Sequence, residues 1–242
     1  MAARVLAVGS LGLAALVALS SCRSAAPPVV TADQLQGGVT VLTRPLPGDL
    51  AALYRLRVPS SGGLRLSVLT KGADGRMTIS EPFGSAASIT AWRDGQTPEL
   101  LDLRRGCRLE VGDVSAVIGV ARLPLPQAVR LLGGRLPVLG GDRIEASSGG
   151  WVQIRGDGWS CRARVATDPW RVVEVDGPLG TEAPTWRLRL SHHTSSVPGS
   201  IRLDRSDGDW AELELVRLEW NSVKQLPELP KLPVCEEPHP PR

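Results

Sequence analysis

The sequence predicts one mainly β domain built from a continuous series of antiparallel strands. Apolar and polar residues alternate along many short segments, such as 54–58, which is typical of a sheet with one apolar and one polar face. Short Gly-rich connections, at 59–63 and 71–75, join successive segments, and connections of this length link antiparallel neighbours. So many antiparallel strands with one apolar face must close into a barrel, pair as a sandwich or wrap around something.

The first half of the domain contains six expected strands and three expected helical segments. Residues 48–53 resemble a short helical turn, with Asp49 near its start. After Asp113 the apolar residues fit helical spacing up to residue 121, and residues 127–132 form another short helix, with Pro126 in its first turn and Gly133 at its end. The expected strands are 54–58, 64–68, 76–79, 86–92 and 99–103, with a possible sixth at 107–111.

The second half continues the β pattern and concentrates the tryptophans. In the last strand the alternation shifts by one residue after Leu215, as in a β-bulge. Five of the seven Trp residues lie between 151 and 210; each is expected in the core, but together they could also line a cavity for an apolar ligand. The expected strands are 151–155, 160–166, 171–175, 186–190, 201–203 and 211–220, and we expect about ten or eleven strands in total.

The N-terminus predicts export and lipidation. Residues 1–21 have the charge and the short apolar run of a signal peptide, and the run is too short for a comfortable membrane span. Leu19-Ser20-Ser21-Cys22 fits the bacterial lipobox, so we expect Cys22 to carry the lipid anchor. The expected organisation is a signal peptide (1–21), a lipidated tether (22–47), one domain (48–221) and a Pro-rich disordered tail (222–242).

Three cysteines remain after Cys22, and two of them could pair outside the cytoplasm. Cys107 and Cys161 both lie in strand-like segments, whereas Cys235 lies in the Pro-rich tail. The sequence therefore favours the pair Cys107–Cys161 without fixing the connectivity. Since no two of the three have the C-x-x-C spacing, a metal site is less expected.

Composition and motifs favour a binding protein over an enzyme. The formal net charge is +3 with no basic block, so nucleic acid is not an expected partner. The sequence has no G-x-S-x-G, Walker A or G-x-G-x-x-G motif and no convincing nucleophile–base pair, so we expect no catalysis and no cofactor. His192 and His193 are adjacent, so on a strand they would point to opposite faces and not share a metal.

One turn, at residues 80–85, stands out because it contains the only Phe of the chain. Pro82 and Gly84 favour a tight turn between the strands 76–79 and 86–92. Phe83 either folds back on the rim of the core or points outward into something apolar. Since no other large apolar side chain lies between Glu81 and Ser88, we predict that Phe83 points outward and enters lipid.

Two short motifs resemble the LolB family, the outer-membrane lipoprotein receptors of the bacterial lipoprotein-sorting pathway. Residues 81–85 (Glu-Pro-Phe-Gly-Ser) are similar to the family's Asn-Pro-Leu-Gly-Ser loop, with Phe83 in place of Leu. Residues 123–126 (Leu-Pro-Leu-Pro), the short helix and 134–137 (Gly-Arg-Leu-Pro) resemble the family's Pro-Leu, helix, Gly-Leu-Pro passage. The lipobox and Trp220-Asn221 also correspond, so the resemblance covers about residues 50 to 221 in order and spacing.

The resemblance implies an unclosed antiparallel half-barrel, capped by short helices, whose apolar cavity holds the acyl chains of lipoproteins. It also implies membrane insertion through Phe83, with Pro82 and Gly84 shaping the loop, a LolA-like periplasmic carrier as donor, and outer-membrane phospholipid as the destination. The expected location is the periplasmic face of the outer membrane, and we expect a monomer. By their inward alternation, the residues expected to line the cavity are Leu64, Leu66, Val68, Met77, Ile79, Trp186, Leu188 and Leu190.

Two alternatives remain open at this stage. The chain could be a more general carrier of free lipid or glycolipid, built on a similar half-barrel. It could also be a structural or accessory lipoprotein of the outer membrane, whose apolar face is filled core.

Overall fold

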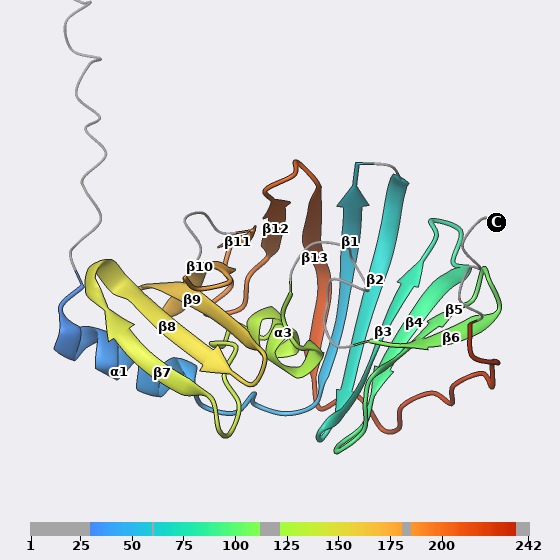
Figure 1. The fold of residues 1–242 in the computed structure, drawn as a ribbon, viewed down its shortest axis with the longest axis horizontal. Helices are drawn as coiled ribbons and strands as arrows, with labels where there is room; N and C mark the ends of the chain where they lie inside the picture. Colours follow the sequence, from blue (N-terminus) through green and yellow to red (C-terminus); the bar gives the residue numbers. More distant parts are fainter. Residues whose placement is uncertain (1–29, 60, 112–121, 181–184, 236–242) are drawn as a thin grey trace, which may run out of the picture.

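The protein forms one antiparallel sheet of thirteen strands that curves around two helices without closing (Figure 1). The structure is a computed structural model that describes residues 30–59, 61–111, 122–180 and 185–235. Cys22 and the helix expected after Asp113 lie outside the described residues. The mainly β fold that the residue pattern predicts and the unclosed sheet that the resemblance implies are both confirmed.

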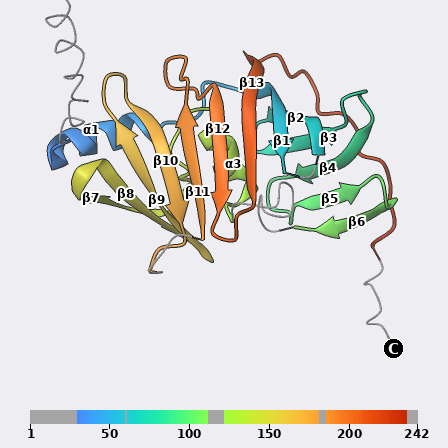
Figure 2. The same ribbon diagram turned by 90° about the horizontal axis from the view of Figure 1, so that it is seen from above.

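The sheet consists of two meanders joined at its centre. The first contains β1 (Leu50–Val58), β2 (Ser61–Lys71), β3 (Asp74–Ser80), β4 (Ala86–Trp92), β5 (Glu99–Asp102) and β6 (Cys107–Glu110). The second contains β7 (Arg143–Ser147), β8 (Trp151–Gly156), β9 (Trp159–Ala166), β10 (Arg171–Gly177), β11 (Trp186–Ser191), β12 (Ser200–Arg205) and β13 (Trp210–Trp220). Strands β1 and β13 pair, so that β6 and β7 form the two edges (Figure 2).

A β-bulge lies at the joint between the two meanders. Leu53 pairs with Arg217 and Tyr54 pairs with Leu215, which leaves Val216 without a partner in β1. The extra residue reverses the alternation in β13, as the sequence predicts. Val216 is accordingly 57% exposed, while Leu213 remains in the core.

Helix α1 (Ala32–Leu42) covers the end of the sheet near β7. Its capping box joins Thr31 and Gln34, a signal that is readable in the sequence but that we did not use. The ring of Trp170 packs so closely on Gly38 that a Cβ there would lie 2.4 Å from it, so Gly is required. The buried face of the helix consists of Leu35, Val39 and Leu42.

Helix α3 (Leu125–Leu132) lies within the curve of the sheet, on the chain that connects one sheet edge to the other (Figure 1). It corresponds to the helix expected at 127–132, and Pro126 occupies its first turn as expected. Leu125, Val129 and Leu132 are buried, so this helix fills part of the space that the sheet encloses.

Two local predictions were wrong. Residues 50–53, expected in a helical turn, begin β1, because Leu50 and Ala52 extend the alternation of Tyr54 and Leu56. Strand β7 was not predicted, because four of its five residues are polar or small and none of them is fully buried.

Residues 222–235, expected to be disordered, form an extended strap along the outer face of the first meander. The Arg76 side chain reaches the carbonyls of Pro227 and Glu228 at 3.5 Å. Arg108 N–H donates to Pro233 O at 2.8 Å, and Cys235 N–H donates to Arg108 O at 2.9 Å. Through these backbone hydrogen bonds the strap pairs with the free edge of β6, the edge that faces away from β5.

The disulfide joins Cys107 to Cys235, so the favoured pair Cys107–Cys161 was wrong. Cys161 is instead a free thiol within the core, and burial raises its pKa. Cys107 points to the side of β6 that the strap reaches, whereas Cys161 lies on β9 in the other meander, five strands beyond β1 in the sheet. Alternation along each strand could not indicate that the two cysteines lie in different halves of the sheet.

Candidate functional site

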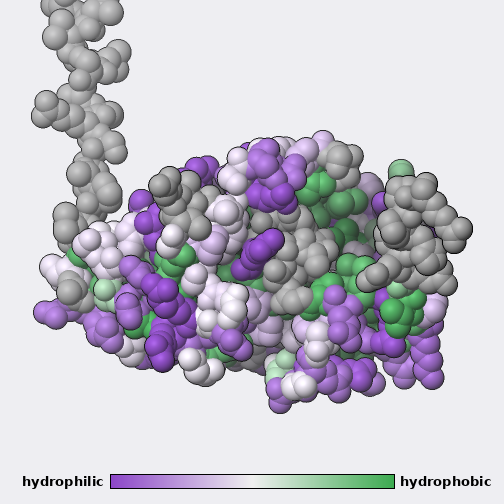
Figure 3. Space-filling model, in the orientation of Figure 1, coloured by the Kyte–Doolittle hydropathy of each residue, from purple (hydrophilic) through white to green (hydrophobic). Residues whose placement is uncertain are grey.

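The concave face of the sheet carries a continuous apolar surface. Seven of the eight residues expected to line a cavity are buried there, and Leu64 is half-buried against the same core. Register supports a common face, since Leu66 lies opposite both Tyr54 and Ile79, and Val68 lies opposite Met77. The space-filling view shows hydrophobic residues gathered in the interior of the half that holds β1–β6 (Figure 3).

A small apolar void lies between this face and α3. Its volume is about 40 Å³, and its lining contains no polar surface. Four of the expected cavity residues line it, while Leu64, Val68, Ile79 and Trp186 belong to the surrounding core cluster and do not line the void. The lining residues are Leu66, Met77, Leu123, Ala128, Leu131, Leu132, Leu188, Leu190, Ile201, Leu203 and Leu213.

Sequence reasoning missed most of the wall contributed by α3 and by the segment before it. Ala128, Leu131 and Leu132 recur at helical spacing, so the apolar face of the predicted helix was a usable signal. Ile201, Leu203 and Leu213 were recognised as alternating strand residues but were not assigned to the cavity. No local feature of these residues indicates that β13 pairs with β1, or that β12 therefore lines the same void as the first meander.

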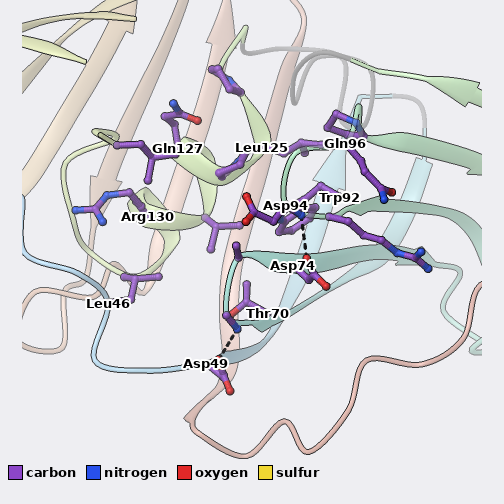
Figure 4. Close-up of a pocket in the computed structure, with 18 of the residues that line it drawn as sticks. Leu46, Asp49, Thr70, Asp74, Trp92, Asp94, Gln96, Leu125, Gln127 and Arg130 are labelled. Carbon is purple, nitrogen blue, oxygen red and sulfur yellow. Dashed lines mark hydrogen bonds between the residues drawn. The ribbon is translucent and has the colours of Figure 1, made fainter. Parts of the chain in front are cut away.

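Helix α3 separates the inner void from an outer cleft of about 670 Å³ (Figure 4). Ala128, Leu131 and Leu132 face the void, whereas Leu125 and Val129 line the cleft. On the opposite side the cleft is lined by the β2–β3 and β4–β5 turns, including Asp74, Trp92, Asp94 and Gln96.

Two carboxylates of the outer cleft accept hydrogen bonds from the turns that line it. Asp49 accepts from Lys71 Nζ and from Gly72 N–H, both at 2.8 Å, and these two contacts lower the pKa of its carboxyl. Asp94 N–H donates to Asp74 Oδ1 at 2.9 Å (Figure 4). These hydrogen bonds connect the turns around the cleft, whose walls contain both polar and apolar residues.

Buried Arg130 fixes α3 in place. Its Nη2 donates to Thr43 O at 2.8 Å and Arg44 O at 2.9 Å, beyond the end of α1, and its Nε donates to Leu136 O at 3.0 Å. Burial lowers the pKa of this guanidinium, but its five donors suit the unpaired carbonyls after a helix. The position of α3 thus depends on a few polar contacts in addition to its apolar face.

The buried polar atoms without a hydrogen-bond partner among the described residues include Tyr54 OH on β1, Thr90 Oγ1 on β4 and Gln127 Oε1 on α3. Gln127 lines the outer cleft, and none of the three residues lines the void. Tyr54 is 0% exposed and Thr90 is 1% exposed. Burial alone raises the pKa of the Tyr54 phenol. Unpaired polar atoms at this depth are uncommon in native proteins and call for an explanation.

The β3–β4 turn presents Phe83 to solvent. Glu81 N–H donates to Ser85 O and Gly84 N–H donates to Glu81 O, both at 2.9 Å, and Gly84 has a φ of 91° that favours glycine. Arg104 pairs with Glu81 at the base of the turn. Phe83 is 98% exposed, so its ring does not fold back on the core.

The remaining candidate groups do not form a second site. Trp151 and Trp210 lie under Arg162 and Arg202 at 4.5 and 4.9 Å, and no Trp lines the inner void. His193 Nε2 lies 2.9 Å from Val172 O, and burial lowers its pKa. Among the described residues, no group of His, Cys, Asp and Glu is arranged to hold a metal ion.

No helix within the described part of the chain is long and apolar enough to cross a membrane.

Two solved structures share this architecture. One is a LolA superfamily protein from Nitrosomonas europaea, with a TM-score of 0.52 and 13% identity over 80% of this chain and 95% of that one. The other is a protein domain named for outer membrane lipoprotein sorting, from Vibrio parahaemolyticus, with a TM-score of 0.52 and 10% identity over 79% of this chain and 93% of that one. No family model and no curated protein matches the sequence. The likeness assigns the fold, a LolA-type half-barrel.

Proposed function

We propose that this chain is a LolB-like outer-membrane lipoprotein that accepts acylated lipoproteins from a periplasmic carrier and inserts them into the outer membrane. The observation that carries the proposal is the wholly apolar void under α3, inside a sheet that does not close on itself. The LolA-type fold and the names of its structural neighbours support the same class of function.

The physical need for such a binder is large. Each methylene group moved from water to an apolar site gains ~0.8 kcal/mol. An acyl chain of about fifteen such groups therefore gains roughly 12 kcal/mol when it leaves water. Exposing the chain to water during transfer would cost the same free energy. A concave face lined by leucine, isoleucine and methionine side chains supplies this environment without any chemical step.

The void as it stands is too small for this ligand. An apolar cavity of about 150 Å³ accommodates a single benzene molecule, whereas this void has about 40 Å³. Binding therefore requires α3 to move away from the sheet, which joins the void to the outer cleft. The contacts of Arg130 with residues 43, 44 and 136 would be lost or exchanged in this movement.

Anchoring and delivery complete the proposal. Cys22 would hold the protein at the membrane, and the tether up to α1 would let the domain approach the lipid surface. Phe83, carried by Pro82 and Gly84, would enter the acyl region of the membrane during transfer.

Displacement of an apolar fluorescent probe tests the binding step. We expect the soluble domain to bind the probe, a synthetic diacylated lipopeptide to displace it, and Leu188→Asp to lose this binding, because the charge lies in the wall of the void. The matched control Arg189→Asp changes the neighbouring exposed residue of β11 and should bind normally. Displacement by phospholipid alone would favour a general lipid carrier, and no binding would favour a structural lipoprotein.

A further inference from the structure

The two unpartnered hydroxyl groups of the concave face belong to residues that pair with residues in the wall of the void. Tyr54 on β1 is directly opposite Leu66, and Thr90 on β4 is directly opposite Met77. Leu66 and Met77 both line the void, and directly paired residues of an antiparallel sheet project to the same face. The hydroxyl groups are therefore neighbours of the wall, inside the apolar surface.

Neither hydroxyl is needed for packing. Phe and Val have nearly the same shapes as Tyr and Thr, and they would bury no unpaired donor. Thr70, on the same face, shows the ordinary alternative, because its Oγ1 accepts from Leu50 N–H at 2.7 Å. Burying a hydroxyl without a partner costs free energy, so a partner in another state of the protein is the simplest account.

We propose that Tyr54 and Thr90 donate hydrogen bonds to the ester or amide carbonyls of the bound ligand. The inference rests on the proposed function and makes its ligand more specific: an amphiphile whose acyl chains are attached through carbonyl groups. A bare hydrocarbon would leave both donors unpaired. The raised pKa of Tyr54 keeps the phenol protonated, as a donor to a carbonyl must be.

A matched pair of ligands isolates this interaction. A monoacylglycerol ester and the alkylglycerol ether of the same chain length differ in one carbonyl. We expect the wild-type soluble domain to bind the ester about three- to tenfold more tightly than the ether. Tyr54→Phe and Thr90→Val should each reduce affinity for the ester by up to about tenfold, and leave affinity for the ether unchanged.

Thermal melts of the unliganded variants provide a second readout. Tyr54→Phe and Thr90→Val should melt at or above the wild-type temperature, because each removes an unpaired polar group. The control Thr70→Val should melt lower, since Leu50 N–H loses its acceptor, while its ester-to-ether ratio stays at the wild-type value.

Three outcomes would overturn the inference. An ester-to-ether ratio of one in the wild type, or a ratio unchanged in both variants, removes the carbonyl contact. A lower melting temperature in both Tyr54→Phe and Thr90→Val shows that the hydroxyls already have partners in the unliganded protein. If neither glyceride binds, the proposed function fails as well.

Discussion

Phe83 is the residue whose position departs most from what its chemistry favours. A Phe side chain gains ~1.5–3 kcal/mol when it is buried, yet this ring is 98% exposed on a turn closed by two backbone hydrogen bonds. Folding therefore draws little stability from it. The same gain remains available to a complex or a membrane that covers the ring.

Replacing Phe83 by Glu should leave folding intact and stop delivery. We expect Phe83→Glu to melt within a few degrees of the wild type, to bind acylated peptide normally, and to fail in transfer to liposomes. Val216→Glu is the matched control, because Val216 is also exposed but lies on the outer face of β13. A large loss of stability with normal transfer would show that Phe83 acts in the core.

The outward position of Phe83 could be predicted because its determinants are local. Pro82 and Gly84 restrict the turn, and no apolar neighbour follows within the loop. The partner of Cys107 could not be predicted, because its choice depends on which strands become neighbours in the folded sheet. The unpaired hydroxyl groups of Tyr54 and Thr90 are likewise invisible in a sequence, where they resemble any other inward-facing residue.

The C-terminal strap shows how a low-complexity element can be ordered by its neighbours. Between residues 226 and 233 the sequence repeats Leu-Pro-x, and burial repeats with it: Leu226, Leu229 and Leu232 are half-buried, while the intervening residues are exposed. A period of three is typical of a polyproline II helix, which places every third residue on one side. The Pro content alone suggested disorder, but the repeat gives the segment one apolar side that packs on the sheet.

Removing the disulfide should measure what attachment of the strap contributes. The bridge connects residues that are 128 apart in sequence, so its loss should lower the free energy of unfolding by about 2–4 kcal/mol. We expect Cys107→Ser/Cys235→Ser to unfold at lower urea concentration than the wild type. Reductant should produce the same shift in the wild type and none in the double variant. Equal midpoints for the oxidised wild type and the double variant would contradict this account of the strap.

At the scale of elements, prediction succeeded where alternation is strong. Strands such as β3, β11 and β13, including its bulge, follow directly from the spacing of apolar residues. Strand β7 escaped because it lies at an edge and presents mostly polar residues. Helix α1 escaped because Gly37 and Gly38 weaken its helical pattern, although Gly38 is explained by the close packing of Trp170.

The whole molecule follows from two meanders whose apolar faces must be covered together. Alternation alone predicted an antiparallel sheet with one apolar face and left closure open, whereas the resemblance implied an unclosed half-barrel. The structure has the sheet unclosed, with α3 inside its curve. The pairing of β1 with β13 across the length of the domain has no local signal and was not predicted.

Membrane attachment is tested on the full chain. If Cys22 carries the anchor, Cys22→Ala should lose acyl mass and leave the membrane fraction as an unprocessed precursor or a soluble protein. Cys161→Ala is the matched control, since its thiol is buried within the domain and should not affect fractionation. Mass spectrometry and cell fractionation provide the two readouts. An unchanged distribution, with no loss of acyl mass, would exclude lipidation at Cys22.

The joint between β1 and β13 also sets an order of events as the chain emerges during synthesis. Each meander consists of strands that follow one another in sequence, so each can form from local hairpins as the chain emerges. Strand β1, however, has one side without a partner until residues 210–220 have arrived. Until then the first meander therefore presents a long, unprotected strand edge, which is a template for association with other chains. Safe completion of the sheet thus depends on how quickly its last strand follows its first.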